Sequence, residues 1–234
     1  MFSVTEMQNF TMFSFSHIVT FLLFLLVCFV FIYYRAKLQA HKALIKWTLF
    51  SILIVCEVLQ HTWIILTGQW EVKELPLQLC SLSTFLAIFL FLKKNQKVFN
   101  LLYFIGLLPA ILSMVTPELE YHFPHFRFFK YFLHHSAIPL SVLYFILIEN
   151  YRVPKKAIIH SLLILNIIAV PIYVLNQLLD TNFFYLASPT DNETILSFFG
   201  NGIWYYINLE IAAIVVFCIT YWPMAWLIKR EKTL

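Results

Sequence analysis

Long apolar stretches alternate with short polar segments along the 234 residues of the chain. A helix needs about 20 apolar residues to cross a bilayer core, within a range of roughly 17–25. The pattern therefore predicts an all-α fold, a polytopic membrane bundle of seven transmembrane helices in a single integral membrane domain covering residues 1–234. The expected spans are residues 17–34, 47–67, 77–92, 98–116, 128–148, 157–178 and 203–228.

The positions of Lys and Arg orient this bundle. Thirteen of the 16 basic residues fall in four short clusters, Arg35–Lys46, Lys93–Lys97, Arg152–Lys156 and Lys229–Lys232. Cytoplasmic loops of membrane proteins carry an excess of such residues. We therefore expect the N-terminus outside, the C-terminus in the cytoplasm, and the first span to be an uncleaved anchor, because its basic cluster follows the apolar run.

Composition narrows the class of protein further. Hydrophobic residues make up 61% of the chain, charged residues only 12%, and the mean hydropathy is +0.80, which excludes an ordinary soluble domain. Because the basic residues lie in short loops, we interpret the net charge of +4 as orientation and contact with anionic lipid rather than nucleic-acid binding.

The four cysteines do not form a disulfide framework. Cys28, Cys56 and Cys218 fall inside spans, where small apolar packing is the usual role. Cys80 lies about one helical turn inside the outer end of the third span, and no second cysteine shares that depth.

Polar side chains within the spans gather mainly in the outer half. Such groups are costly in lipid and usually face the bundle interior or a wet cavity. The residues concerned are Glu57, Gln60 and His61 on one face of the second span; Cys80; Arg127, Tyr131 and His135 at every fourth position of the fifth, flanked by His134; Asn166 near mid-depth; Asn176; and Glu210. The concentration of polar side chains at one membrane depth predicts a pocket that opens toward the outer face. A pore should be polar along its whole length, which argues against a channel and more weakly against a transporter.

A cysteine and a histidine at one depth suggest a nucleophile and its base. The thiolate is the reactive form of cysteine, and a nearby imidazole can generate it. Cys80 and His135 are the pair expected here, with Gln78, Asn176, Tyr185 and Trp204 as candidate donors to an oxyanion. Simpler alternatives remain: cysteine packing, a structural Glu57–His61 pair, and Arg127 and Lys130 as interface anchors instead of phosphate ligands.

The chain resembles a known family in two motifs and two later segments. These are LPLQLCSLSTF (75–85), TPELEYHFPHFRFFKYFLHHS (116–136), and the stretches 164–189 and 204–210. They resemble the YwaF-like bacterial integral membrane family, which is related to the eukaryotic transmembrane protein 164, a cysteine-dependent phospholipid acyltransferase. The resemblance implies that Cys80 accepts the acyl group and that His135 is the essential histidine.

Two departures from the family pattern bear on the site. Relatives commonly read LPLHLC where this chain has Gln78, and SHG where it has His134, His135 and Ser136. The doubled histidine leaves open which one is the base. A more distant likeness to the androgen-induced integral membrane hydrolases, which use a threonine and a histidine, draws attention to Thr84.

The sequence hypothesis is therefore a membrane-embedded lipid acyltransferase. It moves a fatty acyl group from a phospholipid to a lysolipid-type acceptor through a Cys80 thioester, with His135 as acid/base. We expect no metal, since His122 and His125 lack a clearly placed third ligand, and no cofactor. The remaining expected roles are pocket polar residues, Glu57, Gln60, His61, Asn166 and Glu210; oxyanion or orienting residues, Gln78, Asn176 and Tyr185; and headgroup binding, Arg127 with His125.

Two alternatives stay open. One is a membrane lipid hydrolase, with water replacing the acyl acceptor. The other is a non-catalytic lipid- or solute-binding protein or transporter, with Glu57 and Glu210 as proton-coupled groups. The expected location is a bacterial plasma membrane with the site toward the outer leaflet. Oligomeric state, acyl donor and acceptor are left open.

Overall fold

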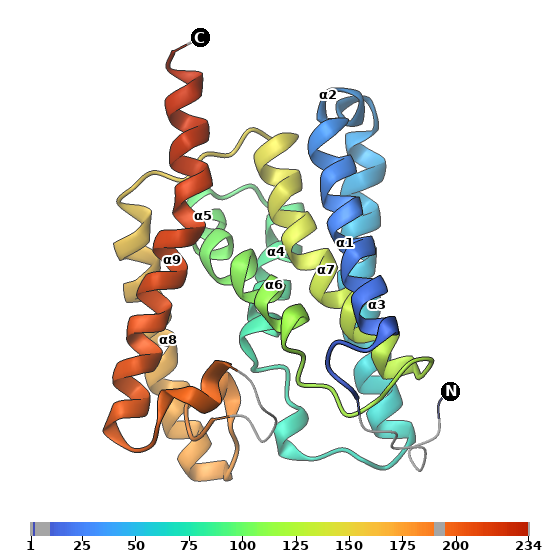
Figure 1. Cartoon of the computed structure of the whole chain (residues 1–234), viewed down its shortest axis with the longest axis vertical. Helices are drawn as coiled ribbons and strands as arrows, with labels where there is room; N and C mark the ends of the chain where they lie inside the picture. Colours follow the sequence, from blue (N-terminus) through green and yellow to red (C-terminus); the bar gives the residue numbers. More distant parts are fainter. Residues whose placement is uncertain (1, 3–9, 190–194, 234) are drawn as a thin grey trace.

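The computed structural model describes residues 2, 10–189 and 195–233, so the N-terminal segment and the loop before the last helix are described only in part. Within these residues every regular element is a helix (Figure 1). The α-helices are α1 (Phe15–Tyr33), α2 (Arg35–Leu38), α3 (Lys42–Leu66), α4 (Leu79–Leu92), α5 (Gln96–Gly106), α6 (Leu108–Val115), α7 (Phe126–Leu147), α8 (Ala157–Leu179) and α9 (Ile203–Glu231). The short 3₁₀ helices are η1 (Gln39–His41), η2 (Val72–Glu74), η3 (Phe183–Tyr185) and η4 (Ile195–Phe199).

The all-α membrane bundle predicted from the sequence is confirmed. Among the described residues, six helical stretches are long and apolar enough to cross a membrane: Phe15–Tyr33, Arg35–Leu66, Val72–Leu92, Gln96–Val115, Ala157–Leu179 and Ile203–Glu231. The seventh expected span is α7, a 22-residue helix in the midst of the bundle. Polar residues such as Lys130, His134 and His135 make α7 less apolar than the other six.

The fourth expected span is divided into two helices, α5 and α6, which meet at Leu107. Pro109 follows the break at once; it has no amide hydrogen and its ring crowds the carbonyl four residues earlier. That carbonyl, of Ile105, instead accepts a hydrogen bond from the Ser83 hydroxyl of α4 at 3.3 Å. In lipid every backbone polar group needs a partner inside the protein. The same hydroxyl also lies 2.9 Å from the Leu79 carbonyl of its own helix, so Ser83 shares its hydrogen between two acceptors and ties α4 to the break.

Helix α7 is the most central of the long helices and packs against α1, α3, α4, α5 and α6. Gly106 at the end of α5 allows a close approach to it, since a Cβ at that position would lie 3.1 Å from the side chain of Ile138. Small residues serve this purpose between membrane helices, where van der Waals packing drives association. Phe99, Tyr103 and Phe145 fill the core beside this contact.

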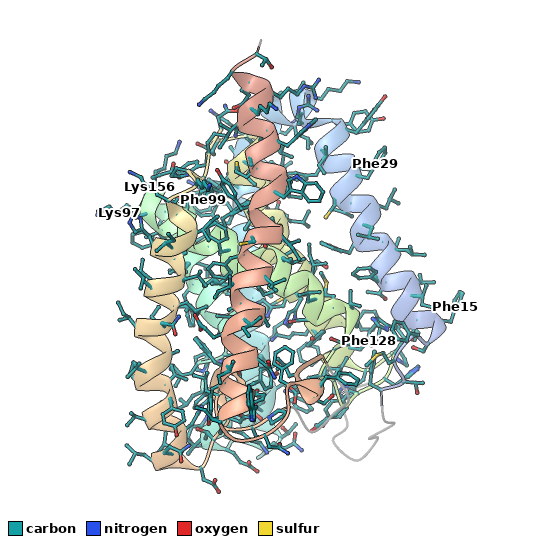
Figure 2. All side chains as sticks on the ribbon, turned by 60° about the vertical axis from the view of Figure 1, so that its left-hand side comes forward. Phe15, Phe29, Lys97, Phe99, Phe128 and Lys156 are labelled. Atoms are coloured by element: carbon teal, nitrogen blue, oxygen red, sulfur yellow. The ribbon has the colours of Figure 1, made fainter. Side chains whose placement is uncertain are left out.

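The basic clusters gather at one end of the bundle. Lys97 and Lys156 lie together there, whereas Phe15 at the start of α1 lies toward the other end (Figure 2). Ion pairs link elements at this basic end: Lys94 with Glu149, and Arg152 with Glu231 near the end of α9. We call the other end the site end. The assignment of the basic end to the cytoplasm stays a prediction from the charge pattern.

Candidate active site

A chain of polar side chains joins α3, α4 and α7 inside the bundle. Nε2 of His134 lies 2.7 Å from the Thr84 hydroxyl and 3.4 Å from Oε1 of Glu57. The other carboxylate oxygen of Glu57 lies 3.6 Å from Nε2 of His61. Thr84 and His134 are buried, and among the described residues Oε1 of Glu57 is buried without a hydrogen bond. The predicted grouping of Glu57 and His61 extends in the structure to two residues of the neighbouring helices.

His135 has a defined tautomer. Its Nδ1 lies 2.9 Å from the carbonyl oxygen of Tyr131, one turn earlier on α7, and its ring stacks on the Tyr131 ring at 4.1 Å between centroids. A carbonyl oxygen only accepts, so Nδ1 carries the hydrogen and Nε2 has a free lone pair. Within the described part of the chain Nε2 makes no hydrogen bond. A buried imidazole oriented in this way is suited to act as a base.

Cys80 occupies the first turn of α4 and is half-buried. Its thiol lies near Ser113 of α6, whose hydroxyl donates to the Pro109 carbonyl at 3.0 Å. Tyr131 is a shared neighbour of Cys80 and His135: it interacts electrostatically with the thiol, stacks on the imidazole, and donates from its hydroxyl to the Ser113 carbonyl at 2.8 Å. No hydrogen bond joins Cys80 directly to His135 in the described residues.

A compact turn, residues 181–188, lies against the start of α4. Gln78, the residue before α4, accepts a hydrogen bond from the backbone N–H of Phe184 at 3.0 Å. Phe184 and Tyr185 both have positive φ, 58° and 55°, a region that residues other than glycine rarely occupy. Such strain persists only where the surroundings enforce it, and it is common at functional sites. Gln78 therefore braces the turn and is engaged through its carbonyl oxygen.

Asn176 is the second brace of the turn. Its amide donates to the Phe183 carbonyl at 2.9 Å, and its Oδ1 accepts from the Phe183 N–H at 2.8 Å and the Thr181 hydroxyl at 3.0 Å. We predicted an oxyanion donor or an orienting residue here. The structure places Asn176 where it shapes the turn, with its amide engaged within that turn.

Tyr185 projects from this turn toward the site. Its hydroxyl donates to the Glu118 carboxylate, and its carbonyl accepts from the Tyr205 hydroxyl at 2.6 Å. It also interacts with Cys80 and Tyr131. Burial and then the Glu118 charge raise the pKa of Tyr185, so the phenol stays protonated and remains a donor. Tyr185 thus lies near Cys80, with its one hydroxyl hydrogen donated to Glu118.

The headgroup candidates Arg127 and His125 lie at the site end. The Arg127 guanidinium lies over the rings of Trp63 and Tyr121, at 5.3 and 5.9 Å. His125 caps α7 by accepting from the Arg127 N–H at 3.1 Å and stacks on Tyr121 at 4.1 Å. Both residues therefore stabilise the start of α7, and the Arg127 guanidinium places a positive charge at the site end of the bundle.

The last four candidates lie apart from this cluster or at its edge. Asn166 donates to Glu210 at 3.1 Å, joining α8 to α9 on an exposed surface. Gln60 is half-buried one turn from Glu57 on α3. Trp204 is exposed at the start of α9. The structure thus separates the Asn166–Glu210 pair from the buried residues around Cys80.

Lys130 is a site residue whose position the sequence left open. Its ammonium interacts electrostatically with Glu57, Cys56 and Cys80, and with His134 and His135. The four-residue spacing from Lys130 to His134, which puts both on one helix face, was the available signal. Among the described residues no group of three or more His, Cys, Asp or Glu side chains is arranged to hold a metal.

Comparison with known proteins gives one match. The profile of the TMEM164 family matches residues 12–221, most of the chain and all of the site residues described above. Searches of curated proteins and of solved structures find no match.

Proposed function

Because this integral membrane protein belongs to the TMEM164 family, we propose that it is a cysteine-dependent phospholipid acyltransferase. The observation that carries the proposal is the orientation of His135. Its Nδ1 is bound to the Tyr131 carbonyl, its Nε2 makes no hydrogen bond among the described residues, and its ring stacks on Tyr131, which interacts electrostatically with Cys80. A base needs this arrangement, and catalytic hydrogen bonds are often long until substrate binds.

The reaction would proceed in two acyl transfers. Nε2 of His135 takes the Cys80 proton, and the sulfur attacks the carbonyl carbon of a phospholipid ester. The ester C–O bond breaks, His135 returns the proton to the leaving alcohol, and the acyl group remains on Cys80 as a thioester. In the second half His135 deprotonates the hydroxyl of a lysolipid-type acceptor, whose oxygen attacks the thioester and releases the Cys80 thiol.

Tyr185 is the candidate oxyanion donor that interacts with Cys80. An oxyanion is stabilised by preorganised donors held near the reacting carbonyl. Tyr185 is fixed in a strained turn and interacts with Cys80, but its single hydroxyl hydrogen is donated to Glu118 and would have to turn from that carboxylate to reach an oxyanion. We place the site in the outer leaflet of the membrane, a bacterial plasma membrane by the family resemblance, because it lies toward the starts of α4 and α7, away from the end of the bundle that carries α2 and the C-terminus (Figure 1).

The test is detection of the acyl-enzyme. Purified protein in nanodiscs is incubated with a labelled phospholipid and analysed by intact-mass spectrometry. We expect a hydroxylamine-sensitive acyl adduct that is absent from Cys80→Ala and retained by Cys218→Ala, a cysteine exposed on α9. Unchanged acyl transfer in Cys80→Ala would refute the proposal.

A second candidate function is lipid hydrolysis with Thr84 as the nucleophile. The supporting observation is the 2.7 Å contact between the Thr84 hydroxyl and Nε2 of His134. This candidate predicts release of free fatty acid that persists in Cys80→Ala and disappears in Thr84→Val. The acyltransferase predicts the opposite dependence, with acylated acceptor as the product.

A further inference from the structure

A shallow apolar groove runs between α3 and α7 on the outer surface of the bundle. Its volume is about 270 Å³, and its lining consists of Ser51, Ile52, Val55, Cys56, Leu59, Phe126, Phe129, Lys130 and Leu133. Four of these side chains also face away from the protein: Val55 is 49% exposed, Leu59 44%, Phe129 44% and Leu133 50%. In a membrane this surface meets hydrocarbon, so the groove is open sideways to lipid.

The dimensions of the groove suit one chain of one leaflet. From Ser51 to Leu59 the helix rises roughly 12 Å at 1.5 Å per residue. Half of a hydrocarbon core of about 30 Å is roughly 15 Å. The antiparallel α7 follows the same course from Phe126 to Leu133. A linear hydrocarbon chain parallel to both helices would fill this length.

Lys130 joins the groove to the polar cluster. Its hydrocarbon stem forms part of the groove wall, while its ammonium interacts with Glu57, Cys56 and Cys80. Within the described residues no carboxylate lies within ion-pair distance of this ammonium, and it makes no hydrogen bond. A cation in lipid normally has a partner, and an electron-rich group on a ligand whose remainder is apolar could supply one here.

We propose that the α3–α7 groove binds one acyl chain of the donor phospholipid, with the chain's ester carbonyl facing the Lys130 ammonium at the entrance to Cys80. The inference rests on the proposed function and names its donor site. The chain lies along Val55, Leu59, Phe129 and Leu133, and Lys130 stabilises the negative charge that develops on the carbonyl oxygen as sulfur attacks. The length of the groove then determines which donor acyl chains are preferred, and Lys130 acts as a catalytic residue.

The binding half of the proposal is tested without chemistry. A phospholipid with a photoactivatable group at the end of one acyl chain is incorporated into nanodiscs with Cys80→Ala protein and irradiated. We expect peptide mapping to find cross-links within residues 51–59 and 126–133. Val55→Phe should abolish these cross-links. Val58→Phe should retain them, because Val58 is an equally lipid-facing position of α3 outside the groove. Cross-links spread over all lipid-facing helices, or unaffected by Val55→Phe, would overturn it.

The catalytic half uses active enzyme. Val55→Phe should shift the preference toward donors with shorter chains, and Val58→Phe should not. Lys130→Gln should lower kcat about 100-fold with little change in KM, and Lys130→Arg should restore part of the loss because it returns the positive charge. An unchanged kcat in Lys130→Gln would overturn the role of Lys130. Groove cross-links without any Cys80 adduct would support the lipid site and refute the acyltransferase. A Cys80 adduct without groove cross-links would support the acyltransferase and refute the lipid site.

Discussion

The side-chain oxygen of Gln78 accepts a hydrogen bond from the backbone N–H of Phe184, 106 positions later in the chain, at 3.0 Å. This contact holds the 181–188 turn against the first turn of α4, where Cys80 lies. Gln78 thus holds the turn beside the candidate nucleophile, and we expect the turn to cover the Cys80 thiol.

Replacing Gln78 by Leu should loosen this cover. The substitution leaves the Phe184 N–H without its acceptor, and because this bond is only partly buried the cost should lie at or below about 1 kcal/mol, the lower end for a buried group. We expect a lower thermal unfolding temperature and faster alkylation of Cys80 by a maleimide, followed by mass spectrometry. Gln177→Leu, on the exposed side of α8, is the matched control and should change neither quantity. Equal alkylation rates in all three proteins would mean that the turn does not cover Cys80.

The two adjacent histidines should respond differently to the same substitution. His135→Gln removes the free Nε2 and should lower the rate of acyl transfer by about 10²–10⁴-fold, the usual contribution of a general base. His134→Gln should chiefly weaken the link to Thr84 and Glu57 and lower stability. Single-turnover rates and thermal melts of both variants in the same detergent separate the two effects. A larger rate loss in His134→Gln than in His135→Gln would identify His134 as the base.

Asn176→Ala should destabilise the protein by about 2–3 kcal/mol, because three hydrogen bonds inside a buried turn lose their partner. Asn166→Ala provides the comparison on the same helix, since Asn166 is exposed and bonds Glu210. We expect a clearly smaller loss there. Denaturant unfolding in mild detergent measures both; if the two losses were equal, the turn would not depend on Asn176.

Glu149 at the basic end should make stability depend on acid pH. Burial tends to raise its pKa, but hydrogen bonds from Lys94 and Tyr144 and the Lys94 charge outweigh it and hold the pKa below its usual value. A carboxyl group with a lowered pKa in the folded state contributes stability above its unfolded value of about 4.3. That contribution is lost as pH falls toward the folded pKa.

Melting temperatures of the native protein and Glu149→Gln between pH 7 and pH 3 test this dependence. The native protein should melt higher at neutral pH, and the difference should shrink on acidification. A difference that stayed constant over this range would exclude the Glu149 ion pair as its source.

The sequence predicted the helices well because lipid imposes a strict rule: each span must be long, apolar and helical. It also predicted that Tyr131 and His135 share a face, since helical residues four apart are neighbours. It did not predict the 181–188 turn, because the positive φ values of Phe184 and Tyr185 lack the usual glycine signal and are enforced by distant residues. The polar links of Thr84 and Lys130 across helices depend on packing angles that spacing within one helix does not determine.

The braced turn has a consequence for how the reaction would be measured. It packs against the start of α4, where we expect it to cover Cys80 from the water side, whereas the groove beside Lys130 opens into the bilayer. For a donor lipid that enters through the groove, the effective concentration is its amount per area of membrane and not per volume of buffer. The rate of the proposed enzyme should then follow the mole fraction of donor lipid in the nanodisc, and dilution of the nanodiscs themselves should leave the turnover of each molecule unchanged.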